Sequence, residues 1–224
     1  MIPPLRLPRP PMAGALAAGA SAGGHVVIDD SESLDAGLLD RIDKALAECA
    51  DEARSQMMLK HFNGRGPTRE ECNEEVDTDR RGKPVTRAMQ LGIEQHEVAL
   101  KCAEERLNKL KPGGFSISPR YRYDPKTEKA THIPREVVQE LLNKGRGAEL
   151  RGTLEPDVVI HAGQPHQVQA VRDYKFPCVN TDEWSSWREY PEGHVHAGIN
   201  QQRLYHDALQ VKPLMVQPRL GVNQ

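Results

Sequence analysis

The 224-residue chain lacks several features that would assign it to particular classes of protein. It has no run approaching the roughly 18 apolar residues of a membrane-spanning helix, so we expect no membrane span. Its first residues, MIPPLRLPRPPMAGALAAGASAGG, contain no strong apolar stretch, so we expect no secretory signal peptide. The net charge is only −2 and is spread along the chain. Any nucleic-acid contact is therefore expected to be a local patch, because a global basic field is excluded.

The cysteines show none of the spacings of metal sites. They are Cys49, Cys72, Cys102 and Cys178. No CxxC pair and no Cys–His zinc pattern occurs, so we predict reduced, mostly buried thiols.

One short stretch resembles the start of a zinc-protease HExxH motif. His96 and Glu97 supply its first two residues, but position 100 is Leu100 where the second histidine is required. A surface pair on a helix is the better interpretation of His96 and Glu97.

Composition and periodicity divide the chain into three parts. Residues 1–24 are rich in Pro, Ala and Gly and predict a flexible leader that cannot bury a core. Residues 25–111 predict a helical region, with an apolar stripe at three- and four-residue steps from Leu38 to Cys49. Within it, Thr68 and Glu71 form a capping box for a short helix, and a second long helix is expected over 85–110.

Residues 112–224 show a different pattern, and no internal repeat is visible. The expected elements are two strands within 115–134, a helix over 134–145, strands over 148–155, 156–163 and 166–178, a helix over 194–209, and a strand over 213–220. The predicted fold class is therefore α/β (α+β): a helical N-terminal part followed by a mixed β-sheet flanked by helices.

Three charged residues lie in this apolar, strand-like part of the sequence. Asp157 opens one expected strand, while Asp173 and Lys175 lie on one face of the next, because side chains alternate along a strand. Two carboxylates a few ångströms apart repel by about 4 kcal/mol at a near-surface dielectric, so a cation between them is expected. Mg²⁺ accepts carboxylate oxygens, and an adjacent ammonium can orient a water molecule or stabilise developing negative charge. The alternative is structural: a turn aspartate and an ion pair.

Pro156-Asp157 followed by Asp173-x-Lys175 resembles the motif of the PD-(D/E)XK nuclease superfamily, whose fold is restriction-endonuclease-like. The resemblance covers roughly residues 134–220, within a nuclease-like domain of residues 112–224. It implies a core of helix, three strands, helix and strand (αβββαβ). It also implies that Asp157, Asp173 and the backbone carbonyl of Tyr174 bind Mg²⁺ or Mn²⁺, and that Lys175 acts on the attacking water.

Two further features extend the resemblance. Gln201 and Tyr205 fit the QxxxY element that some branches of the superfamily carry on the helix after the catalytic strand. The alternative is that both residues lie on a solvent-exposed edge of that helix. The family also often uses a glutamate from the first core helix. Glu136 and Glu140 are the candidates here, and Glu140 is preferred because it lies near the middle of the expected helix.

The resemblance implies a metal-dependent nuclease. DNA is the expected substrate, and RNA is the alternative. Similar domains occur at the tips of antibacterial toxins, or effectors. These are made in a bacterial cytoplasm, delivered by a specialised secretion system and neutralised by an immunity protein. Two alternatives stay open. The fold could serve as a non-catalytic module that binds nucleic acid or a partner, or the helical half could act as an adaptor.

An aromatic segment follows the expected catalytic strand. It contains Trp184, Trp187 and Tyr190. These rings could stack on bases, but anchoring of the loop or core is the favoured interpretation.

Overall fold

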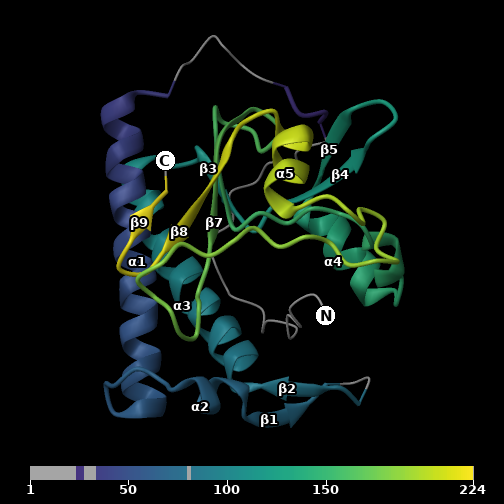
Figure 1. The fold of residues 1–224 in the computed structure, drawn as a ribbon. Helices are drawn as coiled ribbons and strands as arrows, with labels where there is room; N and C mark the ends of the chain where they lie inside the picture. The colour runs from purple at the N-terminus through teal and green to yellow at the C-terminus, as the bar shows by residue number, and fades with distance from the viewer. Residues whose placement is uncertain (1–23, 28–33, 80–81, 224) are drawn as a thin grey trace.

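The computed structural model describes residues 24–27, 34–79 and 82–223 and has a mixed α+β fold. The predicted leader, apart from Gly24, lies outside the described residues. Two long helices stand beside a central sheet, and shorter helices and hairpins surround it (Figure 1). Among the described residues, no helix is both long enough and apolar enough to cross a bilayer.

The two long helices pack against each other as the sequence predicts. They are α1 (Ala36–Phe62) and α3 (Arg87–Leu110). The Asp35 carboxylate accepts a hydrogen bond from the Leu38 N–H at 2.8 Å and caps the start of α1. Small buried residues, including Ala53 and Ala103, lie in the shared core of the two helices. Ile42, Leu46 and Cys49 of the predicted apolar stripe lie in the same core, which confirms that the stripe faces α3.

The prediction of reduced thiols is wrong. The four cysteines form two disulfides, Cys49–Cys102 between α1 and α3, and Cys72–Cys178, with Cα–Cα distances of 5.6 and 6.1 Å. Spacing along the chain tests for metal motifs, whereas disulfide pairing depends on which cysteines the fold brings within bonding distance.

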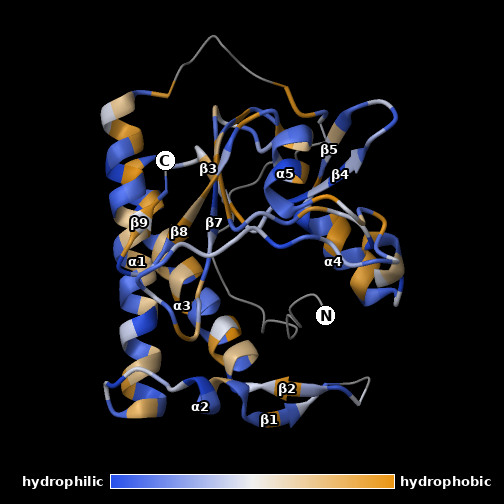
Figure 2. Cartoon of the chain, viewed as in Figure 1, coloured by the Kyte–Doolittle hydropathy of each residue, from blue (hydrophilic) through white to orange (hydrophobic). Residues whose placement is uncertain are grey.

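The central sheet has five strands in the order β3-β6-β7-β8-β9. Its members are β3 (Phe115–Ile117), β6 (Val158–His161), β7 (Val168–Tyr174), β8 (Pro213–Gln217) and β9 (Gly221–Val222). Strand β6 is antiparallel to both neighbours, whereas β7 and β8 run parallel and are connected through α5 (Gln201–Leu209). Hydrophobic residues run along the central strands (Figure 2).

The sheet separates two cores. Val158 and Ile160 of β6 pack with residues of α1 and α3, whereas Val159 packs with Leu204 and Leu209 of α5. Because successive side chains of a strand point to opposite faces, this alternation places the long helices on one face and α5 on the other. The fold is a layered arrangement in which β6 and β7 are covered on both sides.

The prediction of a strand over residues 148–155 is wrong. Gly147–Leu150 forms a 3₁₀ turn, and Gly152 adopts a left-handed φ of 71°. The Thr153 hydroxyl then donates to the Leu150 carbonyl at 2.7 Å, which closes the turn. Alternating polar and apolar residues suggested a strand here, but local turn chemistry decides the conformation.

The helix predicted over 134–145 forms as α4 (Arg135–Asn143), but it is not a core helix. None of its nine described residues is buried. The helix that precedes the first strand of the central sheet is α3, so the core elements follow the order α3, β3, β6, β7, α5, β8. A separate hairpin of β4 (Arg120–Asp124) and β5 (Lys129–Ile133), followed by α4, is inserted between β3 and β6.

The remaining elements are small. The predicted capping box is confirmed at the start of α2 (Arg69–Asn73), where Thr68 and Glu71 exchange hydrogen bonds. A hairpin of β1 (Glu75–Thr78) and β2 (Pro84–Thr86) was not predicted, nor was β9. The helix expected over 194–209 begins only at Gln201, after a series of turns.

A buried ion pair fastens the sheet to α1. The Arg172 side chain, 3% exposed on β7, donates from two nitrogens to both Asp43 oxygens at 2.7 and 2.8 Å. Asp43→Ala leaves the buried guanidinium unpaired, so we expect the free energy of unfolding to fall by about 3 kcal/mol. Denaturant titration measures this loss.

The matched control for Asp43→Ala lies on the same helix. Glu48 pairs with Arg106, but both side chains are substantially exposed. Glu48→Ala should therefore cost less than about 1 kcal/mol. Equal losses in the two variants would contradict the structural role given to the Arg172–Asp43 pair.

Candidate active site

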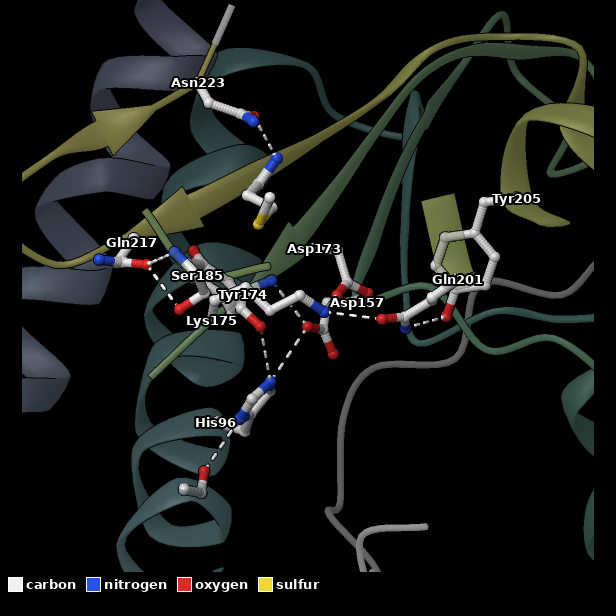
Figure 3. Close-up of polar contacts among 12 residues, drawn as sticks. His96, Asp157, Asp173, Tyr174, Lys175, Ser185, Gln201, Tyr205, Gln217 and Asn223 are labelled. Atoms are coloured by element: carbon white, nitrogen blue, oxygen red, sulfur yellow. Dashed lines mark hydrogen bonds and ion pairs between the residues drawn. The ribbon is translucent and has the colours of Figure 1, made fainter. Parts of the chain in front are cut away.

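The two predicted carboxylates lie on neighbouring strands. The register pairs Val158 of β6 with Arg172 of β7, which places Asp157 opposite Asp173. The two residues are only 2% and 3% exposed, and Figure 3 shows their side chains side by side. Burial raises the pKa of the Asp173 carboxyl, Lys175 lowers it, and the adjacent Asp157 charge raises it further, with a net upward shift. The site therefore concentrates negative charge where water is largely excluded.

The backbone of β7 holds Asp157 in place. The Tyr174 N–H donates to Asp157 Oδ2 at 2.8 Å, and the Ser118 N–H donates to the Asp157 carbonyl at 2.8 Å. The Tyr174 contact orients the carboxylate, whereas the Ser118 contact fixes the backbone of Asp157.

Lys175 connects the Asp173 carboxylate to α5. Its ammonium donates to Asp173 Oδ2 and, at 2.8 Å, to Gln201 Oε1. The Gln201 amide in turn donates to the Tyr205 hydroxyl at 2.9 Å (Figure 3). Burial raises the pKa of Tyr205 well above its ordinary value, so the hydroxyl stays neutral. Asp173, Lys175, Gln201 and Tyr205 thus form one continuous chain of hydrogen bonds.

His96 of α3 belongs to this group, although its sequence context predicted a surface residue. Its Nδ1 lies 2.9 Å from the Gly92 carbonyl. Its Nε2 lies 3.1 Å from the Tyr174 carbonyl and 3.2 Å from Asp157 Oδ2. These oxygens only accept hydrogen bonds, so both ring nitrogens are placed to donate, as in the imidazolium. Burial disfavours the charged ring, but the Asp157 carboxylate outweighs it and raises the pKa of His96.

A signal for His96 was present in the sequence. His96 precedes Ala99, Ala103 and Leu107 by three, seven and eleven residues, and these three side chains are buried on α3. A histidine on the core-facing side of a helix needs a polar partner, which here is the pair of strands that carries the carboxylates.

Glu140 and Glu136 do not join the group. The Glu140 side chain is 60% exposed on α4 and pairs with Lys144 one turn away. The physical reason is the corrected topology: α4 lies outside the core, and the helix against the carboxylates is α3. Glu136 is likewise exposed on α4.

The donor atoms have the chemistry of a divalent-cation site. Two carboxylates and the Tyr174 carbonyl are oxygen ligands of the kind that Mg²⁺ and Mn²⁺ accept. Among the described residues, no three His, Cys, Asp or Glu side chains are already arranged around a common metal position. The oxygens instead receive hydrogen bonds from Lys175 and His96, which balance their charge. Asp157, Asp173 and the Tyr174 carbonyl fit a hard cation when His96 Nε2 no longer donates a hydrogen bond to them.

No family model matches the chain, and neither a curated protein nor a solved structure is detectably similar to it. Conclusions about its activity therefore depend on the geometry of the site.

Proposed function

We propose that the protein is a metal-dependent nuclease that hydrolyses phosphodiester bonds, with DNA as the expected substrate. The observation that carries the proposal is the pair of buried carboxylates, Asp157 and Asp173, with the Lys175 ammonium directed at one of them. Two adjacent buried carboxylates are costly in the absence of a cation, and divalent cations that accept oxygen ligands also accept phosphate oxygens.

The roles of the side chains follow from their positions. Asp157, Asp173 and the Tyr174 carbonyl would hold Mg²⁺ or Mn²⁺, which when bound polarises the phosphoryl group. Lys175, held by Asp173 and Gln201, orients the attacking water or stabilises negative charge that develops on the phosphorus oxygens. Gln201 and Tyr205 fix the position of Lys175 from the side of α5.

The order of the core elements supports the same proposal. The sequence α3, β3, β6, β7, α5, β8 follows the helix, three strands, helix and strand order of the superfamily that the motif resembles. In this arrangement His96, from the first helix, takes the position where a glutamate was expected. A neutral imidazole there would add a nitrogen ligand, which suits Mn²⁺ better than Mg²⁺.

The direct test is cleavage of plasmid and single-stranded DNA with Mg²⁺, with Mn²⁺ and with EDTA. We expect cleavage with either metal, more with Mn²⁺, and none with EDTA. Asp157→Asn keeps the shape of the side chain but removes its charge, and should abolish cleavage. Cleavage that persists in EDTA, or its absence with every metal, would refute the proposal.

A second candidate is a module that binds nucleic acid without cleaving it. The observation in its favour is that Lys175 and His96 already balance the two carboxylates. Binding of DNA with no cleavage at any metal concentration would identify this function.

The biological setting proposed is that of an antibacterial toxin with a protective partner protein. The two disulfides add a condition to this proposal, because such bonds form and persist in oxidising compartments. The active chain is then expected to mature outside a reducing cytoplasm, and the protective partner to cover the face that carries Asp157 and Lys175.

A further inference from the structure

Residues 177–200, here called the strap, connect β7 to α5 and are fixed on both sides of Trp187. The Gln217 side chain, fully buried at the end of β8, accepts from the Ser185 N–H at 2.9 Å and from its hydroxyl at 2.8 Å. On the other side, the Gln201 N–H donates to the Arg188 carbonyl at 2.9 Å. The backbone around Trp187 is therefore held by the same two elements, β8 and α5, that flank the candidate site.

The indole ring of Trp187 lies against Lys175. The ammonium nitrogen is 4.7 Å from the ring centroid, within the range of a cation–π contact. An ammonium has three N–H groups, and Asp173 and Gln201 accept two of them. The carboxylate, the amide and the aromatic face thus enclose the head of Lys175 from three directions.

Hydrogen bonding does not account for an indole at this position. Trp187 Nε1 is buried and has no hydrogen-bond partner among the described residues. An unpaired buried N–H costs free energy, which a phenylalanine with a similar aromatic face would avoid. What the tryptophan supplies is the more electron-rich face, because indole is the best of the aromatic partners for a cation.

We propose that Trp187 is a positioning residue, whose ring face holds the Lys175 ammonium in the orientation that acts on the substrate. The inference rests on the proposed nuclease function, because that function gives Lys175 its task. A lysine side chain is flexible, so a rigid face on one side and two acceptors on the other restrict its head to one position. In this proposal the strap does more than connect β7 to α5, because its Trp187 positions Lys175.

The contact can be tested without any cleavage assay. The chain contains two tryptophans, Trp184 and Trp187, so Trp187 is the single tryptophan in Trp184→Phe. In this background we expect Lys175→Met to shift or change the intensity of the tryptophan emission. Lys126→Met, an exposed lysine in the β4–β5 turn, should leave the emission unchanged. Emission that does not respond to Lys175→Met overturns the inference.

The role in positioning is tested by kinetics with a DNA oligonucleotide. We expect Trp187→Leu to lower kcat about 10- to 30-fold with KM within about twofold, the size expected for a largely desolvated cation–π contact. Trp187→Phe, which keeps an aromatic face and the fold, should retain more of kcat than Trp187→Leu. Equal losses in the two folded variants, or a change in KM alone, overturn the inference. If the wild type cleaves with no metal, the proposed function fails instead, and the emission experiment still decides whether the contact exists.

Discussion

Lys175→Met should lower kcat for phosphodiester cleavage by at least about 100-fold, the size of effect seen when one stabilising donor is removed from an active site. Methionine keeps the unbranched apolar stem that packs near Trp187, but it removes the N–H groups that Asp173 and Gln201 accept. Since the ammonium acts mainly on charge that develops in the transition state, KM should change little. Steady-state kinetics on an oligonucleotide, with circular dichroism to verify the fold, measures both quantities.

The matched control for Lys175→Met is again Lys126→Met in the exposed β4–β5 turn, which should keep the wild-type kcat. Gln201→Leu should lie between the two, because it removes one of two acceptors that hold the ammonium and leaves the ammonium itself. A well-folded Lys175→Met protein that cleaves DNA at the wild-type rate would remove Lys175 from the proposed mechanism.

The site residues that were predicted from the sequence lie close to one another along the chain or on consecutive strands. Asp173 is in β7 and Lys175 directly follows the end of that strand, two residues later, while Gln201 and Tyr205 are one turn apart on one helix. Alternation along a strand and the helical repeat determine which of these side chains share a face. Asp157 joins them because β6 and β7 are consecutive antiparallel strands with a short connection.

The parts that were missed depend on contacts between distant segments. His96 lies 61 positions before Asp157 in the sequence and reaches it only because α3 packs under the sheet. The cysteine pairs span 53 and 106 positions, and no local pattern encodes them. Glu140 was chosen because it lies near the middle of a helix expected to belong to the core, but Val137 and Leu142 of that helix remain 42% and 52% exposed. Periodicity predicted the helix correctly and its burial incorrectly.

The Cys72–Cys178 disulfide should provide one of the largest single contributions to stability. It closes a segment of 106 positions and joins α2 to the strap only three residues after Lys175. The double variant Cys72→Ala/Cys178→Ala should lose about 4–5 kcal/mol of unfolding free energy, because cross-linking a loop of this length restricts the unfolded chain strongly. Guanidinium denaturation without reductant measures the difference from the wild type.

A reductant provides the internal control for this prediction. Adding dithiothreitol should lower the stability of the wild type further than that of the double variant, in which only Cys49–Cys102 remains to be reduced. The variant should also show a lower kcat under conditions where it is fully folded, because one anchor of the strap that carries Trp187 is lost. If the double variant unfolds at the wild-type midpoint, the Cys72–Cys178 disulfide does not form in solution. The expectation that the active chain matures in an oxidising compartment would then depend on Cys49–Cys102 alone.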